Sequence, residues 1–498
     1  MSKALGKDTP ESSLKAAIDD NALNPVPLAD RRSGWYLMAN TAGVGTTLAL
    51  LLIGGSASYL VGTKWTLILG VTAAVFGSIL GTLVGRVCQS TGMTSTATMR
   101  FHGLGLSGSS VGSLIFAIMI IGFIGIENTL LYYGTLFLLG WSPDAYNAVL
   151  IYGLLAITWI VLSTFGIKVV QKTSLALTLI SGVLIVYVTF LAVSKSDMTF
   201  NQILASAPSS VEVADLAIAF SSMIAIAGAL SLFGADSARY ARNLRDVAIM
   251  SVGGSLIVNF FFVALGAALY QAGDSLVARY LDDAANYSLS SSLSGASTLD
   301  KVQGLAHSNT GAYFIILVGT LGFVVMYCAQ VKAQVINSYT GSFALANLFE
   351  VTIRRKPNRF AMIIVVNALA LLAVAVDILS AYATFLSILG ILIFSLCALV
   401  VTDHSMTKIR NKTGAELVEK VNWAGIIAIS TGSVTSYILT ATGALPFGFL
   451  ATVGLTPLVY VILRRTILTE GTGTTMVSGT SAFREADGES DIPRLGVH

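Results

Sequence analysis

The sequence predicts an all-α integral membrane protein, and three observations lead to this fold class. Of its 498 residues, 54% are hydrophobic and only 11% are charged, a composition that excludes a soluble globular protein. Apolar runs of about 20 residues, each able to cross the roughly 30 Å hydrocarbon core as a helix, recur along the chain. The alternating segments of about ten residues that mark a transmembrane β-barrel are absent. The spans must therefore be helices, because a helix satisfies its own backbone hydrogen bonds in lipid.

The apolar runs predict twelve membrane-spanning helices. The expected spans are residues 35–61, 65–88, 111–139, 146–166, 169–193, 213–236, 246–271, 312–347, 359–377, 379–402, 421–441 and 444–464. They divide the chain into an N-terminal tail (1–33), a ten-helix transport core (34–402), the eleventh and twelfth helices (403–465) and a C-terminal tail (466–498). From Glu470 onward the C-terminal tail is rich in Gly, Thr, Ser and acidic residues, which predicts disorder.

The distribution of basic residues predicts the orientation in the membrane. Fifteen lysines and arginines fall in loops on the side of the N-terminus, against four in the opposite loops, which are Lys64, Lys195, Arg279 and Lys301. Because basic loops remain in the cytoplasm, both termini should be cytoplasmic and the number of spans even. We expect a multi-pass protein of the plasma membrane. The long polar connection 271–311 then lies outside, where a lid and an ordinary solvated loop fit it equally well.

Two ionisable residues lie inside predicted spans. Lys332 interrupts an otherwise uncharged stretch, Tyr327–Asn347, and Glu127 lies in the third span. An ionisable residue at the bilayer centre costs about 3 kcal/mol or more, so such residues usually face a cavity or a partner and mark transport pathways. The sequence therefore predicts a transporter whose site includes both residues. Whether Glu127 pairs with Lys332 or contacts the substrate stays open.

Small residues gather in the first and sixth spans. The first contains the stretch Thr41–Thr47, and the sixth contains Ser221–Ser222 and Ala227–Ala229. A single glycine in a span usually serves close helix packing. Glycine together with threonine also marks the interrupted helices of transporters built from inverted repeats, where exposed backbone groups bind substrate and ion. Since five spans separate the two stretches, we predict a five-plus-five repeat with the first and sixth helices broken.

Three segments carry a resemblance to a known family. GRVCQSTGMTSTATMRFHGLGLSGSSVGSLIFAI from Gly85, GADSARYARN at Gly234–Asn243, and the segment Gln330–Asn347 each resemble the nucleobase:cation symporter 1 family, which includes bacterial cytosine permeases. The matches are collinear and cover most of residues 35–400. The resemblance implies a LeuT-type fold with two interleaved five-helix repeats plus two extra helices. It also implies proton- or sodium-coupled uptake of nucleobases or related heterocycles.

The resemblance assigns substrate positions in the third and sixth spans. Phe123 takes the place of an aromatic ring that stacks on the substrate, and Glu127, one helical turn later, that of a glutamine that hydrogen-bonds the heterocycle. The spacing of four puts both side chains on one helix face. The ring on the other side of the substrate is not matched, because Ala227 stands there, followed by Gly228 and Ala229. A two-sided aromatic sandwich is therefore in doubt.

The eighth span supplies a further substrate position and departs from the family at the ion site. Asn337 aligns with a substrate-contacting asparagine, and Gln334 and Gln330 are the alternatives if the register slips. In sodium-coupled members the first and eighth spans hold the ion, and a threonine ligand's place falls here on Lys332. The corresponding positions of the first span are Gly43, Val44, Thr46 and Thr47.

An ammonium group at this position would itself occupy the cation site and exclude sodium. Because a desolvated lysine exchanges its proton readily, Lys332 could alternate between charged and neutral forms. We predict proton coupling, with Lys332 as the carrier and Glu127 as a second candidate. The alternative is that Lys332 stays charged and only braces the first and eighth spans.

The type of substrate follows from Glu127. A carboxylate accepts two hydrogen bonds from adjacent N–H groups, which cytosine, adenine and guanine present and uracil lacks. An amino-bearing base is therefore the first choice. A cationic amidine or amine, or a vitamin-precursor heterocycle, is the second.

The remaining polar residues indicate no other chemistry. Asp236 and Arg239, at the end of the sixth span, predict a structural or gating ion pair. The four histidines are scattered and the three cysteines form no C-x-x-C pair, so we expect no metal site, no cofactor beyond a coupling proton, and no enzyme. We expect the lipid bilayer and a small molecule as partners, with neither nucleic acid nor an obligate protein partner. A channel or a transporter-like receptor is the alternative from another class.

Overall fold

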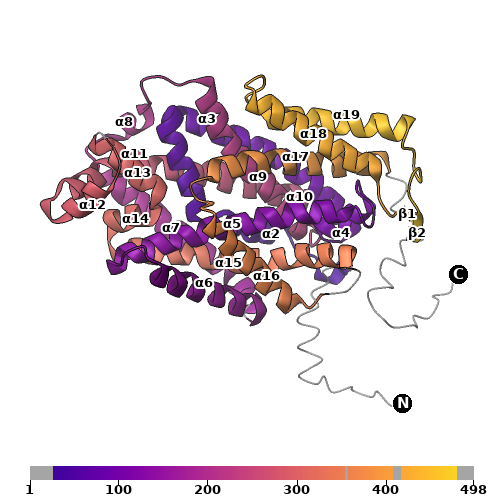
Figure 1. Cartoon of the computed structure of the whole chain (residues 1–498), viewed down its shortest axis with the longest axis horizontal. Coiled ribbons are helices and arrows are strands. Elements are labelled where there is room, and N and C mark those ends of the chain that lie inside the picture. The colour runs from indigo at the N-terminus through magenta and orange to yellow at the C-terminus, as the bar shows by residue number, and fades with distance from the viewer. Residues whose placement is uncertain (1–25, 166, 296, 354–356, 408–416, 479–498) are drawn as a thin grey trace, which may run out of the picture.

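The computed structural model describes residues 26–165, 167–295, 297–353, 357–407 and 417–478. Helices make up nearly all of it and form one elongated bundle (Figure 1). The elements are η1 (Leu28–Asp30), α2 (Gly34–Gly45), α3 (Leu48–Thr91), α4 (Ser95–Phe101), α5 (Ser109–Leu139), α6 (Ala145–Phe165), α7 (Ile167–Lys195), α8 (Phe200–Ala205), α9 (Val213–Ala238), α10 (Leu244–Ser255), η2 (Leu256–Phe262), α11 (Val263–Asp282), η3 (Ala284–Asn286), α12 (Tyr287–Ser292), α13 (Thr298–Ser308), α14 (Thr310–Val318), α15 (Thr320–Ile353), α16 (Arg359–Ala375), α17 (Tyr382–Met406), β1 (Leu417–Glu419), α18 (Trp423–Ala441), α19 (Gly448–Thr466) and β2 (Met476–Ser478).

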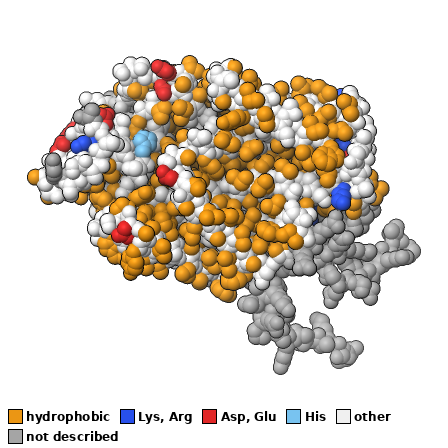
Figure 2. Space-filling model, in the orientation of Figure 1, with side chains coloured by type: hydrophobic (Ala, Val, Ile, Leu, Met, Phe, Trp, Pro, Cys, Tyr) orange, Lys and Arg blue, Asp and Glu red, His pale blue; other side chains and the backbone are white. Residues whose placement is uncertain are grey.

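The described residues contain nine helices long and apolar enough to cross a membrane, and α16 is a shorter apolar helix. Hydrophobic side chains cover most of the face shown in Figure 2, as expected of a surface in contact with lipid. The all-α membrane class is thus confirmed, while the count of twelve spans stays a prediction. Within the bundle, α3 packs along α9 and α11, and α5 packs along α15.

The first span is interrupted, as predicted. Helix α2 ends at Gly45, Thr46 has ψ of 67°, Thr47 is extended, and α3 begins at Leu48. Two local hydrogen bonds close the interruption: the Thr46 hydroxyl donates to the Gly43 carbonyl at 3.1 Å, and the Thr47 amide donates to the Gly45 carbonyl at 3.0 Å. Backbone groups near Gly45 and Thr47 therefore leave the regular helical ladder in the middle of the bundle.

Helix α3 has 44 residues and turns sharply at Gly62, whose φ is 80°. At 1.5 Å per residue a straight helix of this length would extend roughly 66 Å, about twice the hydrocarbon thickness. Glycine is needed at the turn because a side chain there is strained at this φ and its Cβ would lie 2.8 Å from the Ser206 carbonyl oxygen. The turn separates the end of the first span from the second span.

The sixth span is not broken, which corrects our prediction. Helix α9 runs from Val213 to Ala238 as one α-helix. A Cβ at Gly228 would lie 2.8 Å from the Phe394 ring of α17, and the Ala227 methyl would lie 3.1 Å from a Cβ at Gly77 of α3. The small residues of α9 therefore serve close packing against two neighbouring helices.

The C-terminal segment is ordered further than predicted. Strand β2 pairs antiparallel with β1, with Val418 opposite Val477. On its other side, the β1 segment accepts hydrogen bonds from the Leu106 and Ser107 amides through the carbonyls of Glu419 and Lys420. The disorder predicted from Glu470 therefore does not begin there. Residues 479–498, like residues 1–25, lie outside the described part of the chain.

Candidate functional site

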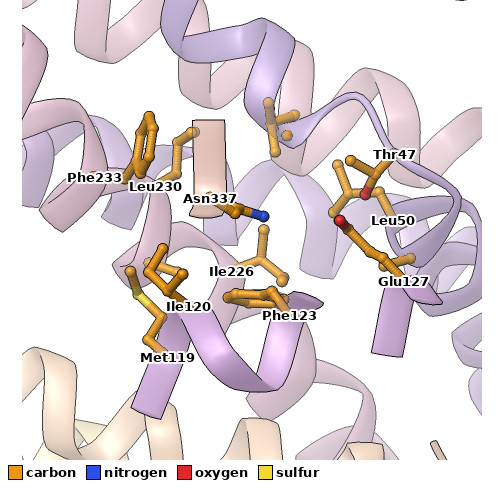
Figure 3. Close-up of a pocket in the computed structure, with 14 residues that line it drawn as sticks. Thr47, Leu50, Met119, Ile120, Phe123, Glu127, Ile226, Leu230, Phe233 and Asn337 are labelled. Carbon is orange, nitrogen blue, oxygen red and sulfur yellow. The ribbon is translucent and has the colours of Figure 1, made fainter. Parts of the chain in front are cut away.

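A cavity of about 60 Å³ lies beside the interruption of the first span. It is several times larger than the roughly 10–15 Å³ that one water requires. The break, the start of α3, and helices α5, α9, η2 and α15 each contribute to its wall (Figure 3). The lining residues are Gly45, Thr47, Ala49, Leu50, Met119, Ile120, Phe123, Glu127, Ile226, Ala229, Leu230, Phe233, Val258 and Asn337.

Two aromatic rings reach the cavity from different helices. Phe123 of α5 was predicted, and its ring also packs edge-on against Phe385 with 6.3 Å between centroids. Phe233 of α9 was not predicted, although Figure 3 shows it at the cavity wall beside Leu230. The sequence signal was available, because Ile226, Ala229, Leu230 and Phe233 follow helical spacing along one face. Phe233 thus adds a second aromatic ring to the cavity wall, which Ala227 does not provide.

The polar groups of the cavity are Glu127, Thr47 and Asn337. Glu127 is only 3% exposed, lies beside Thr47 in the cavity (Figure 3), and keeps one carboxyl oxygen, Oε2, with no partner among the described residues. Asn337 is 4% exposed, and its amide points toward Glu127 without a hydrogen bond to the rest of the described chain. A buried polar group without a partner is unfavourable, so both residues are suited to bind a polar ligand.

Three predicted substrate residues lie outside the cavity. Ala227 and Gly228 face α3 and α17, as described above, so that only Ala229 of this trio lines the cavity. Gln334 is committed to helix packing, because its amide donates to the Asn128 side chain at 2.8 Å and to the Ile124 carbonyl at 3.3 Å. Of the eighth-span candidates, Asn337 is thus the one that reaches the cavity.

Lys332 occupies a buried slot on the other side of the interruption. Its side chain is 2% exposed, and its ammonium group donates a hydrogen bond to the Thr178 hydroxyl of α7. A Cβ at Gly43 would overlap the ammonium nitrogen and lie 2.6 Å from Cε, so the absence of a side chain there admits the amine. Lys332 therefore contacts α2 and α7 from α15.

Lys332 and Glu127 do not form an ion pair. No acidic side chain of the described residues lies within 4.0 Å of Lys332, and Glu127 is oriented toward Thr47 instead. The two buried ionisable groups thus belong to different sites. Among the other predicted ion-site positions, Thr46 bonds to Gly43, Thr47 lines the cavity, and the Val44 side chain lies outside those described.

Asp236 and Arg239 lie at the end of α9, away from the cavity. The Asp236 carboxylate accepts a hydrogen bond from the Ser95 amide at 2.6 Å, at the first residue of α4. The charge of Arg239 acts on that carboxylate, and its guanidinium also lies 4.8 Å from the centre of the Tyr240 ring. This arrangement ties α9 to the linker between α3 and α5, while the structural or gating ion pair stays a prediction.

The interrupted first helix and the cavity beside it lie inside a bundle of long apolar helices, the arrangement of a multi-pass membrane protein. No protein-family model and no curated protein sequence matches the chain. Solved structures do match it. The structure of Mhp1 in an inward-facing conformation matches with a TM-score of 0.68 at 13% sequence identity. The match covers 89% of this chain and 92% of the Mhp1 chain.

Two further structures share the fold. Mhp1, a nucleobase-cation-symport-1 family transporter, in a closed conformation with bromovinylhydantoin bound, gives a TM-score of 0.61 at 14% identity, with 94% of this chain and 100% of Mhp1 covered. A Na⁺-coupled sialic acid symporter gives a TM-score of 0.60 at 14% identity, and the match covers 94% of this chain and 97% of the symporter chain. The chain therefore has the fold of Mhp1, which confirms the LeuT-type fold class implied by the resemblance, while the two five-helix repeats and the two extra helices stay predictions.

Proposed function

We propose that this protein is a secondary active transporter that imports a nucleobase-like heterocycle by proton symport. The observation that carries the proposal is the central cavity, in which Phe123, Phe233, Asn337 and Glu127 meet beside the interrupted helix. The fold shared with Mhp1 and with the sialic acid symporter supports a transporter rather than an enzyme. A discrete cavity in the middle of the bundle also favours a transporter over a channel.

The side chains of the cavity favour a flat ligand with N–H donors. The rings of Phe123 and Phe233 offer apolar faces on which a base can stack. The free carboxyl oxygen of Glu127 accepts from an N–H group, and the Asn337 amide provides one acceptor and two donors. Cytosine, adenine or guanine would satisfy all of these groups. A cationic amidine is the second candidate, because Glu127 has no buried cation as a partner among the described residues.

Lys332 supports coupling to protons in place of sodium. Its amine fills the slot at Gly43, where the resemblance to sodium-coupled carriers implies an ion site. A permanently charged ammonium with the Thr178 hydroxyl as its hydrogen-bond acceptor would be costly to bury, so loss of the proton during the cycle is favoured. A proton bound and released by Lys332 would then couple transport to the proton gradient.

Uptake into proteoliposomes tests both parts of this proposal. We expect saturable uptake of radiolabelled cytosine, adenine or guanine that responds to an inward proton gradient and persists when sodium is replaced by choline. Unlabelled amino-bases should compete better than uracil or guanidine. Strict dependence on sodium would overturn the role given to Lys332, and flux without saturation would overturn the transporter.

Variants of the cavity provide the second test. Glu127→Ala and Asn337→Ala should each lower uptake about 5- to 150-fold, because each removes a buried hydrogen bond to the ligand worth about 1–3 kcal/mol. The matched control is Asn201→Ala, which changes an exposed asparagine of α8. Wild-type uptake in both cavity variants would place the substrate elsewhere.

A further inference from the structure

A second, much smaller cavity lies between α2, α3, α9 and α10. Its volume is about 10 Å³, which is close to the space that one water occupies. Four hydroxyl groups line it, from Thr41, Ser231, Ser251 and Ser255. Two glycines of α3, Gly77 and Gly81, keep it open, since a Cβ at Gly81 would lie 3.2 Å from the Ser251 oxygen and 3.4 Å from the Ser231 oxygen. It is separate from the central cavity, although Leu230 contacts both.

Two of the four hydroxyls already donate their hydrogens to backbone carbonyls. Ser231 donates to the Ala227 carbonyl at 2.7 Å or the Gly77 carbonyl at 3.1 Å, and Ser255 donates to the Ala74 carbonyl at 3.0 Å. Ser255 also accepts from the Asn259 amide at 2.9 Å. Since a hydroxyl oxygen has two lone pairs, Ser231 retains two acceptor positions and Ser255 retains one.

The other two hydroxyls have no partner among the described residues. Thr41 Oγ1 and Ser251 Oγ are both buried, with side chains 2% and 8% exposed, and neither makes a hydrogen bond. The Thr41 methyl group lies against Gly234 and Gly254, where added Cβ atoms would be 3.3 and 3.8 Å away. Each hydroxyl can therefore donate one hydrogen bond toward the cavity.

We propose that this cavity is a binding site for one water molecule that links α2 to α9 and α10. The water would donate to Ser231 and Ser255 and accept from Thr41 and Ser251, which satisfies all four hydroxyls and both water hydrogens. A sodium ion fits the site less well. It would use the four oxygens but leave the hydrogens of Thr41 and Ser251 without acceptors, and no carboxylate lines the cavity to balance its charge.

The water would hold α2, the N-terminal part of the first span, in place. Thr41 lies in α2 two residues before Gly43, the position against which the Lys332 amine rests. Thr41 is only 2% exposed, so a water-bridged hydroxyl there is worth more than an exposed one. This inference does not depend on the substrate or on proton coupling.

The experiment is a comparison of melting temperatures of the full-length protein in one detergent. Thr41→Val keeps the shape of the side chain and removes the hydroxyl, whereas Thr41→Ser keeps the hydroxyl. If the water is bound, Thr41→Val leaves it without one of its hydrogen-bond donors and should lower the melting temperature by about 1–3 °C. The melting temperature of Thr41→Ser should be higher than that of Thr41→Val. With a dry cavity, Thr41→Val removes an unsatisfied hydroxyl and should raise the melting temperature, which would overturn the proposal.

Matched controls separate the water from general effects. Thr63→Val removes another buried hydroxyl without a partner in the described residues, one that lines neither cavity, and should not lower the melting temperature. Gly81→Ala places a methyl where the water lies and should be destabilising. Gly153→Ala adds a methyl with nothing within 4 Å and should be neutral or stabilising. A Gly81→Ala variant as stable as Gly153→Ala would contradict a bound water.

Two further readouts complete the test. The difference between wild type and Thr41→Val should be the same in sodium chloride and in choline chloride, and a difference seen only with sodium would assign the site to a cation. A high-resolution map of the wild-type protein should show density within hydrogen-bond distance of the four hydroxyls. A map with an empty cavity would overturn the inference even if Thr41→Val failed to fold.

Discussion

The substitution Gly43→Ala tests the slot that holds the buried lysine. The added methyl group would overlap the Lys332 ammonium nitrogen and lie 2.6 Å from its Cε, so the amine has to leave its position. Leaving it breaks the hydrogen bond from Lys332 to Thr178. The substitution is therefore small in volume but acts directly on the residue proposed to carry the proton.

The magnitude follows from three opposing effects. Overpacking costs about 1–3 kcal/mol, and losing the hydrogen bond of a buried amine costs about 1–3 kcal/mol more. Alanine in place of glycine near the end of a helix stabilises the helix by at most about 1 kcal/mol. The free energy of unfolding should thus fall by about 1–6 kcal/mol. Uptake should fall with it, because the amine no longer occupies the site beside α2.

Thermal unfolding and proteoliposome uptake measure the two consequences. Gly182→Ala is the control, since a methyl there meets nothing within 4 Å. The double variant Gly43→Ala/Lys332→Ala removes the amine and should be more stable than Gly43→Ala alone, a non-additivity expected of residues in contact. Additive effects, or a Gly43→Ala protein with normal stability and normal pH-dependent uptake, would refute the placement of Lys332.

Three further predictions concern other parts of the molecule. Phe233→Ala removes one ring of the cavity and should raise the substrate KM about tenfold, because stacking on an aromatic ring is worth about 1–3 kcal/mol; an unchanged KM in uptake assays would exclude contact with the substrate. Gly228→Ala puts a methyl 2.8 Å from the Phe394 ring and should cost about 1–3 kcal/mol of stability, which a thermal shift measures and a wild-type melting temperature would contradict. Burial lowers the pKa of His307 below its usual 6.5, and its Nδ1 lies 3.0 Å from the Ser56 hydroxyl. Because the unfolded chain then binds the proton more tightly, stability should be full above pH about 6.5 and fall as the pH drops, and His307→Gln should flatten that decline in melting temperature.

The fold class was predictable because lipid imposes it on the sequence. Helices are required wherever long apolar runs cross a bilayer, and this constraint does not depend on tertiary contacts. The break in the first span was also predictable, since Gly43, Gly45, Thr46 and Thr47 combine weak helix formers in a short stretch. Lys332 and Glu127 were recognisable by their charge alone.

The sixth span shows where the sequence signal stops. Ala227–Ala229 resembles the first-span stretch in composition, yet it packs against Phe394 and Gly77, far away in the chain, and stays helical. A small residue that interrupts a helix and one that admits a neighbour look alike until the neighbour is known. Thr178 could not be foreseen for the same reason, because its role depends on Lys332 reaching it from another helix.

The position of the two buried ionisable residues indicates how substrate and proton are connected. The Lys332 amine rests against Gly43 in the last turn of α2, whereas Glu127 lies beside Thr47, the residue that precedes α3. Between them lies the non-helical backbone of the interruption. A rotation of α2 relative to α3 would therefore change the surroundings of the amine and of the carboxylate together, although the two groups make no contact. In the transporter proposed here, the interrupted helix rather than an ion pair joins proton binding to substrate binding.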